Sequence, residues 1–269
     1  MARSSSRDSR AGDETGADLA RYYDLDLVDE QSDIDLYLAL ARGVDEPILE
    51  LAVGSGRIAL PLAAAGHAVT GVDRDRHMLE RARRAWQASD AGASGGTLEL
   101  VEGELTTVSL GARFGLVILG FNGLLMLPGR EAQVAALRNV RAHLAPAGRA
   151  VIDIWLPTPE DLAAHDGRLE LAWRRLDPET GEEVAKSWSA RYSPAAAVAR
   201  IDTFFDAWPV NGGPLRRTAR SDVLHLLGAS ELLDLVQRAG LVPQIVAGDT
   251  ELGPFGPDSA RIVLACGLL

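Results

Sequence analysis

Between residues 47 and 154 the chain alternates short apolar segments with segments of helical periodicity. This alternation restricts the folds open to the chain more than any other feature. The apolar segments predict strands at 47–52, 68–72, 97–102, 115–120 and 149–154, and the periodic segments predict helices at 56–65, 75–88 and 130–144. Strands joined by helices run parallel, and a parallel sheet needs helices on both faces. Gly66 and Gly148 stand where a helix returns to a strand, a place that favours positive φ. We therefore predict a doubly wound α/β fold.

The chain after Pro157 has a different pattern of apolar and turn residues. Four apolar runs, at 169–176, 184–192, 198–208 and 215–226, are broken by Asp-Pro, Gly and Asn-Gly-Gly. Short runs separated by turn residues predict an antiparallel meander and not a further parallel strand. A helix from Ser230 to Gly240 and strands at 241–247 and 261–267 are expected to follow, and a helix at 33–42 is expected before the first strand.

Charge and cysteine content exclude several kinds of partner. The formal net charge of -11 opposes nucleic acid, because phosphate binding needs clustered Lys and Arg. Cys266 is the single cysteine and no Cys/His cluster has metal-ligand spacing, so we expect a reducing compartment and no metal. The apolar run from Leu116 to Leu127 is interrupted by Asn122 and is too short to cross a bilayer, and the N-terminus lacks an apolar leader. These features predict a cytoplasmic protein.

The motif from Glu50 to Arg57, Glu-Leu-Ala-Val-Gly-Ser-Gly-Arg, follows a buried strand and opens a helix. Glycines at such a turn let the backbone approach a ligand closely and aim its amides at the ligand. The next strand ends in Asp73, and an acid at that point can accept hydrogen bonds from a ribose diol. The two features together predict a nucleoside site.

The type of nucleoside is ambiguous on these residues alone. Gly54, Gly56 and Ala59 also satisfy the dinucleotide fingerprint G-x-G-x-x-G/A, with an acid near the usual distance. Glu50, however, precedes the turn where its charge would repel a pyrophosphate and attract a cationic ligand. An NAD(P)-dependent oxidoreductase therefore stays as the alternative.

At these motifs the chain resembles the class I S-adenosylmethionine-dependent methyltransferases. The resemblance covers most of the chain from Tyr22, and it includes the glycine motif, Gly71–Leu79, Glu102–Leu105, Phe114–Asn122 and Leu144–Gly148. Tyr22-Tyr23-Asp24 and the meander are similar to the small-molecule subgroup that contains the amino-sugar N,N-dimethyltransferases. The resemblance implies a seven-stranded, mostly parallel sheet with an antiparallel final strand and an inserted antiparallel β lid. Composition and periodicity together with the resemblance predict four parts: a disordered tail at 1–19, a cofactor-binding core at 20–156, a β-rich lid at 157–228, and a helix and hairpin at 229–269 that complete the core sheet.

The resemblance also implies the cofactor, S-adenosylmethionine, and the residues that hold it. Asp73 would bind the ribose, Met78 and Glu104 would face adenine, and the glycine turn with Tyr23 would lie near the methionine end. Met78 also fits plain core packing through its helical spacing with Ala82. The full set implied for the cofactor is Tyr23, Glu50, Ala52, Gly54, Ser55, Gly56, Arg57, Asp73, Arg74, Met78, Gly103, Glu104, Leu105 and Phe121.

Three departures from the family bear on activity. Ala52 replaces the first glycine of the motif, Gly115 stands where the family usually has Asp, and Met126 stands where relatives often carry a histidine. Methyl transfer is an in-line displacement that positioning and water exclusion can accelerate, so a neutral amine needs no strong base.

The acceptor is expected to be a small molecule with a nitrogen or oxygen nucleophile, and the protein a monomer or homodimer. Tyr22, Asn122 and His225 are the catalytic candidates, although His225 in an apolar strand also fits a packing role. Ala52 and Met126 leave one more alternative open, a methyltransferase fold that uses the cofactor for other chemistry or for ligand sensing.

Overall fold

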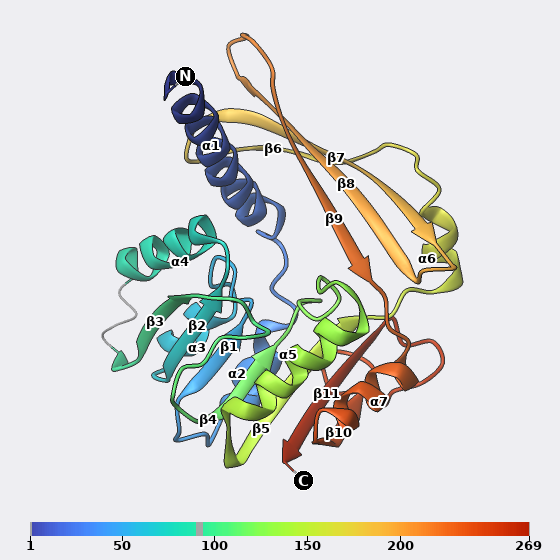
Figure 1. The fold of residues 1–269 in the computed structure, drawn as a ribbon. Coiled ribbons are helices and arrows are strands. Elements are labelled where there is room, and N and C mark those ends of the chain that lie inside the picture. Colours follow the sequence, from blue (N-terminus) through green and yellow to red (C-terminus); the bar gives the residue numbers. More distant parts are fainter. Residues whose placement is uncertain (1, 90–93, 269) are drawn as a thin grey trace. The chain divides into compact units, whose positions relative to one another are not determined.

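The computed structural model of the chain describes residues 2–89 and 94–268, and it separates into two compact units (Figure 1). Residues 31–160 and 225–269 form one unit, which we call the α/β unit. Residues 1–30 and 161–224 form the other, which we call the meander unit. Each unit is described by itself below.

The α/β unit contains one seven-stranded sheet in the order β10-β11-β5-β4-β1-β2-β3. Its strands are β1 (Ile48–Leu51), β2 (Ala68–Asp73), β3 (Thr97–Glu102), β4 (Phe114–Leu119), β5 (Leu144–Trp155), β10 (Leu241–Ala247) and β11 (Arg261–Leu268). The first five strands pair in parallel, and β11 is antiparallel to both of its neighbours. The predicted sheet, with its antiparallel last strand, is confirmed.

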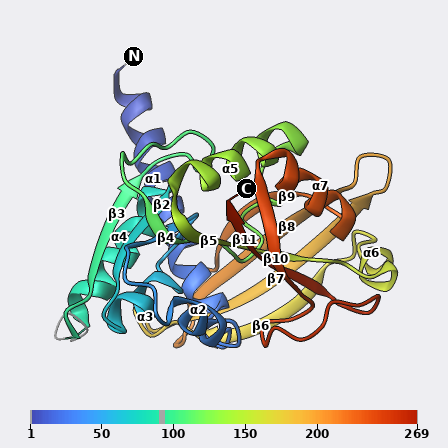
Figure 2. The same cartoon turned by 90° about the horizontal axis from the view of Figure 1, so that it is seen from below.

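Helices cover both faces of this sheet. They are α2 (Ile34–Ala41), α3 (Ala59–Ala64), α4 (Arg76–Ala88), α5 (Gly129–His143) and α7 (Ala229–Arg238). Figure 2 shows α5 and α7 on one face of the sheet and α2 and α3 on the other. Buried side chains from α2 and α3 pack against those of β1 and β4, for example Leu36 and Leu62 against Ile48 and Leu116. Burial of these apolar faces is the main stabilising contribution.

Two element boundaries differ from the prediction for local reasons. The helix predicted at 56–65 begins only at Ala59, because Gly54 and Gly56 have positive φ (56° and 88°) and cannot continue an α-helix. The strand predicted at 149–154 begins at Leu144, where it pairs with Phe114 before a bulge. Most other predicted boundaries hold to within a residue or two.

The meander unit contains a four-stranded sheet in the order β6-β7-β8-β9. The strands are β6 (Glu170–Leu176), β7 (Glu182–Ser193), β8 (Val198–Pro209) and β9 (Arg216–His225), and the short helix α6 (Pro159–Ala164) precedes them. The pairs β6/β7 and β7/β8 are antiparallel, as the sequence predicts.

The N-terminal segment corrects two expectations. The structure has a helix, α1 (Ala2–Asp26), where the sequence predicts a mobile tail at 1–19. Residues 20–30 also group with the meander and not with the predicted core at 20–156. The physical reason is packing: Tyr22 lies in a cluster with Val184 and Phe205, and Trp173 Nε1 donates to Asp26 Oδ1 at 2.7 Å. A meander that forms its core around an N-terminal helix cannot be read from local sequence.

Candidate functional site

The carboxyl ends of β1 and β4 form the point at which the sheet reverses its winding. The chain runs from β1 outward to β2 and β3, and then returns to place β4 on the other side of β1. In open α/β sheets, ligands bind in the crevice at such a switch point. The turn after β1 and the turn after β4 approach each other there, since a Cβ added to Gly123 would lie 3.4 Å from Cβ of Ala52.

Left-handed backbone is concentrated at this switch point. Ala52 has φ 59°, and Phe121 and Asn122 have φ 47° and 65°. These are three of the five non-glycine residues with positive φ in the part of the chain that the structure describes. Such residues persist only where their surroundings hold them, and they cluster at functional sites. We call Gly120–Gly123 the β4 turn.

The glycine turn after β1 is shaped for close backbone approach. A Cβ on Gly56 would lie 3.1 Å from the Leu60 side chain and 3.3 Å from Cβ of Ala82, in a position where φ is already 88°. Gly54 N–H donates to Oδ2 of Asp73 at 2.8 Å, and Asp75 N–H donates to Oδ1 at 2.9 Å. The Asp73 carboxylate is thereby fixed beside the turn, and each of its oxygens retains capacity for a further hydrogen bond.

Glu50 is a buried acid with an unsatisfied oxygen. Glu50 is 4% exposed, and within the described residues its Oε2 has no hydrogen-bond partner. Burial raises the pKa of Glu50 to about 8, against the opposing effect of the Arg57 guanidinium and the Ala59 amide, while Asp73 and Asp33 raise it further. A buried carboxyl oxygen without a partner suits a cation or a hydrogen-bond donor and disfavours a phosphate. The residues present therefore fit a cationic nucleoside such as S-adenosylmethionine better than a pyrophosphate.

Arg57 links the glycine motif to the β4 turn. Its Nη2 donates to Oδ2 of Asp33 at 2.7 Å and its Nη1 to Oδ1, so the pair is bidentate. The guanidinium carbon lies 4.5 Å from the ring centroid of Phe121, a cation–π contact. Arg57 and Phe121, both implied as cofactor residues, are therefore joined to each other at the β4 turn.

The remaining predicted cofactor residues follow the ends of β2 and β3. Asp73 and Glu102 are neighbours in the parallel register, and Gly103 N–H donates to the Asp73 carbonyl at 2.9 Å. The structure thus brings Gly103–Leu105 next to the ribose candidate. In this group Met78 is buried, Arg74 and Glu104 are exposed, and Ser55 and Leu105 are half-buried. Tyr23 lies on α1 in the meander unit, and its role stays a prediction.

Tyr22 lies in the core of the meander unit. Its side chain is 1% exposed and stacks on Phe205 with ring centroids 4.9 Å apart. This enclosure favours a packing role, and a catalytic role for Tyr22 stays a prediction.

The side chain of Asn122 takes part in a structural hydrogen bond. Its Oδ1 accepts from the Trp155 amide at 2.6 Å, and its NH₂ group is a donor. A catalytic role for Asn122 stays a prediction.

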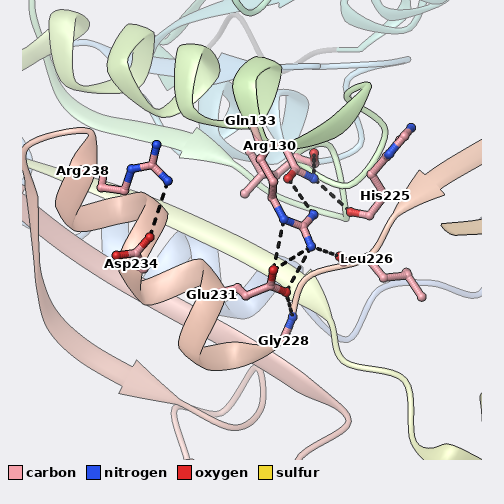
Figure 3. A network of polar contacts seen from close by, with 9 residues as sticks. Arg130, Gln133, His225, Leu226, Gly228, Glu231, Asp234 and Arg238 are labelled. Carbon is pink, nitrogen blue, oxygen red and sulfur yellow. Dashed lines mark hydrogen bonds and ion pairs between the residues drawn. The ribbon is translucent and has the colours of Figure 1, made fainter. Parts of the chain in front are cut away.

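His225 acts through its backbone in the network of Figure 3. Its N–H donates to the Leu125 carbonyl at 2.8 Å, and its carbonyl accepts from Gln133 Nε2 at 2.9 Å. Gln133 Nε2 also donates to the Leu124 carbonyl at 3.3 Å, and Figure 3 shows the imidazole pointing away from Gln133. The network holds the segment after the β4 turn in place, and a catalytic role for the imidazole stays a prediction.

The sequence interpretation missed Asp153 on β5. This residue is 1% exposed, and its Oδ2 accepts from Phe121 N–H (3.3 Å), Tyr37 Oη (3.4 Å) and Arg261 Nη1 (3.1 Å). Burial raises the pKa of Asp153, and the Arg261 guanidinium opposes this. The available signal was an acid inside the apolar strand Val-Ile-Asp-Ile-Trp.

Within the described residues no group of His, Cys, Asp and Glu could hold a metal ion. In the same part of the chain, no helix combines the length and apolar character needed to span a bilayer.

Comparisons with known proteins agree with this geometry. Residues 48–148 match the family model described as a methyltransferase domain. The chain is 29% identical to the cypemycin N-terminal methyltransferase of Streptomyces sp over 45% of its length and 46% of that protein. It is 30% identical to the dTDP-3-amino-3,6-dideoxy-alpha-D-glucopyranose N,N-dimethyltransferase of Streptomyces fradiae over 58% of its length and 60% of that protein. The matched segments thus span about half of each of these curated relatives.

Solved structures match over nearly the whole chain. The CcbJ methyltransferase from Streptomyces caelestis is 26% identical with a TM-score of 0.74, covering 89% of this chain and 96% of that one. DesVI from Streptomyces venezuelae is 21% identical with a TM-score of 0.70, covering 92% and 97%. The second likeness is one of fold alone.

Proposed function

We propose that this chain, whose residues 48–148 match the family model of a methyltransferase domain, transfers a methyl group from S-adenosylmethionine to a small-molecule acceptor. One observation carries the proposal. At the switch point of the sheet, Gly54 N–H orients the Asp73 carboxylate, and one oxygen of the buried Glu50 has no hydrogen-bond partner among the residues that the structure describes. This combination suits a ribose diol joined to a cationic group.

The residues that would hold the cofactor lie on three neighbouring strand ends. Asp73 would bind the ribose hydroxyls, Glu104 and Met78 would contact adenine, and Glu50 with the glycine turn would hold the methionine end. When bound, S-adenosylmethionine supplies a methyl group that its sulfonium already activates. The tasks left to this chain are to bind the two substrates, to orient them and to exclude water.

The preferred acceptor is an amine. Met126, which is 36% exposed, stands where a histidine base would be expected, and Asn122 offers only an amide donor. An amine that arrives neutral needs no base before attack, whereas a hydroxyl does. The curated relatives named above include an N-terminal methyltransferase and an N,N-dimethyltransferase, which supports nitrogen as the nucleophile.

The partner proposed is a free small molecule and not nucleic acid, because the net charge of -11 repels phosphates. We also propose a cytoplasmic location, a monomeric or homodimeric state and a role of the meander unit as a lid.

Titration calorimetry with S-adenosylhomocysteine tests the proposal. We expect binding to the unaltered protein, binding at least about tenfold weaker for Asp73→Ala because a charged acceptor of hydrogen bonds is lost, and no change for the exposed control Glu80→Gln. Absence of heat at millimolar ligand would refute the proposal, and fluorescence of bound NADH would favour the oxidoreductase alternative. A panel of amines and phenols then identifies the acceptor by mass spectrometry. Cofactor consumption without a methylated product would indicate other chemistry.

A further inference from the structure

The β4 turn contains two consecutive left-handed residues that are not glycine. Phe121 and Asn122 have φ 47° and 65°, a region that L residues occupy rarely and then mostly singly. The turn borders the crevice, because Gly123 lies against Ala52 of the turn after β1. A backbone in this conformation must be held by its surroundings or it relaxes.

The amides of both left-handed residues are bound by one residue. Phe121 N–H donates to the Asp153 side chain at 3.3 Å, and Asn122 N–H donates to the Asp153 carbonyl at 3.3 Å. The Asn122 side chain then accepts from the amide of Trp155, two residues further along β5. The end of β5 therefore binds the turn at three points.

The Asp153 carboxylate is itself held in place from two other elements. Tyr37 on α2 donates to Oδ2 at 3.4 Å, and Arg261 on β11 donates to the same atom at 3.1 Å. On its other side, the Phe121 ring contacts Arg57, which is paired with Asp33. The turn is thus constrained by α2, β5, β11 and the glycine motif together.

We propose that Asp153 is a positioning residue that locks the β4 turn in its left-handed form before the cofactor binds. This inference rests on the proposed function, since it assigns the turn to the wall of the cofactor crevice. If the turn is already ordered, the ligand does not have to order it on binding. The free-energy cost of ordering is then avoided, and the affinity is higher. Asp153 itself need not touch the cofactor.

Two measurements on the full chain test this role. Hydrogen exchange followed by NMR reports the amides of Phe121 and Asn122, and calorimetry reports affinity for S-adenosylhomocysteine. For Asp153→Ala we expect exchange of the Phe121 amide to accelerate at least about tenfold, with a smaller effect at Asn122, whose partner is a backbone carbonyl. We expect affinity to fall about tenfold, because the turn must then be ordered by the ligand. Asp153→Asn keeps an oxygen acceptor and should stay within about threefold of the unaltered protein on both measurements.

Two controls separate positioning from general destabilisation. Val140→Ala removes part of a fully buried apolar side chain on α5, and Asp177→Ala removes another buried acid, on the meander unit. Both variants should lower the melting temperature and leave affinity unchanged.

The inference is overturned if Asp153→Ala leaves exchange at Phe121 unchanged, or if either control weakens binding as much. Should Asp153→Ala not fold, rapid exchange of the Phe121 amide in the unaltered protein would also overturn it. If the unaltered protein binds no S-adenosylhomocysteine, the proposed function fails, and exchange alone still decides whether Asp153 holds the turn.

Discussion

At the scale of single residues, Ala52 is the position where side chain and backbone conflict. The family usually has glycine there, and the structure keeps the left-handed backbone (φ 59°) that glycine would adopt without strain. The Ala52 methyl group therefore raises the conformational energy of the turn without changing its backbone conformation. Such a residue costs roughly 1–2 kcal/mol relative to glycine in the same conformation.

Ala52→Gly should therefore stabilise the protein. We expect a gain of up to about 1 kcal/mol, because relief of the strain exceeds the added entropy of the unfolded chain. Differential scanning calorimetry should show a melting temperature higher by about 2–4 °C. Ala135→Gly in α5 is the matched control and should lower stability by about 1 kcal/mol. A lower melting temperature for Ala52→Gly would contradict the strain at this position.

Glu50 predicts a pH dependence of stability. Because burial raises its pKa from 4.5 to about 8, the folded protein binds more protons than the unfolded chain between these values. Its contribution to stability is fully present below pH 4.5 and is lost as pH rises through 8. Glu50→Gln, a neutral mimic, should remove this dependence and be more stable than the unaltered protein at pH 8 by roughly a few kcal/mol. Urea denaturation from pH 5 to 9 measures this, and parallel curves for the two proteins would refute it.

At the scale of elements, polar side chains on α5 connect this helix to the segment after the β4 turn. Gln133 on α5 is fully buried and bonds the carbonyls of Leu124 and His225. Arg130 bonds the Leu226 carbonyl at 2.8 Å and pairs with Glu231 on α7 (Figure 3). These hydrogen bonds hold residues 225–226 against the segment that follows the β4 turn.

The two side chains should contribute unequally. Gln133→Leu leaves the buried carbonyl of Leu124 and the part-buried carbonyl of His225 without this donor and should cost about 2 kcal/mol. Glu231→Gln weakens a pair whose side chains are 34% and 52% exposed, and should cost less than about 1 kcal/mol. Urea denaturation compares them, with Arg84→Ala on the exposed face of α4 as a neutral reference. Equal losses for Gln133→Leu and Glu231→Gln would contradict the ranking.

At the scale of the whole molecule, the chain is two units built from interleaved segments. The meander unit takes its helix α1 from the N-terminus and its strands from residues after 160. Polar contacts supplement the apolar cluster around Tyr22. Lys186 forms an ion pair with Asp26, and Nε of Arg21 lies 2.8 Å from Oδ2 of Asp177. We therefore expect the stability of the meander to depend on the N-terminal segment.

Tyr22→Ala should destabilise the meander unit selectively, by about 3–4 kcal/mol, since it removes a buried aromatic side chain. Hydrogen exchange with mass spectrometry should show faster exchange in β7 and β8 and little change in β1 and β4. Tyr22→Phe keeps the ring and should lose about 1 kcal/mol or less. If β1 and β4 lose protection as much as β7 and β8 do, the two units unfold together, and they are not independent in stability. If Tyr22→Phe abolishes methyl transfer, the hydroxyl has the catalytic role that its burial argues against.

The sequence by itself determined the α/β fold and the glycine turn with Asp73. These features depend on residues that are close together in the sequence. Apolar periodicity specifies each helix and strand, and the glycines specify the backbone conformation of the turn. The tertiary structure alone decided the partners of the chain's distant segments. It placed Tyr22 in the core of the meander, turned Asn122 toward Trp155, and brought Asp153, Tyr37 and Arg261 together. Such contacts join residues on elements far apart in the sequence, and no local pattern specifies which buried polar groups will meet.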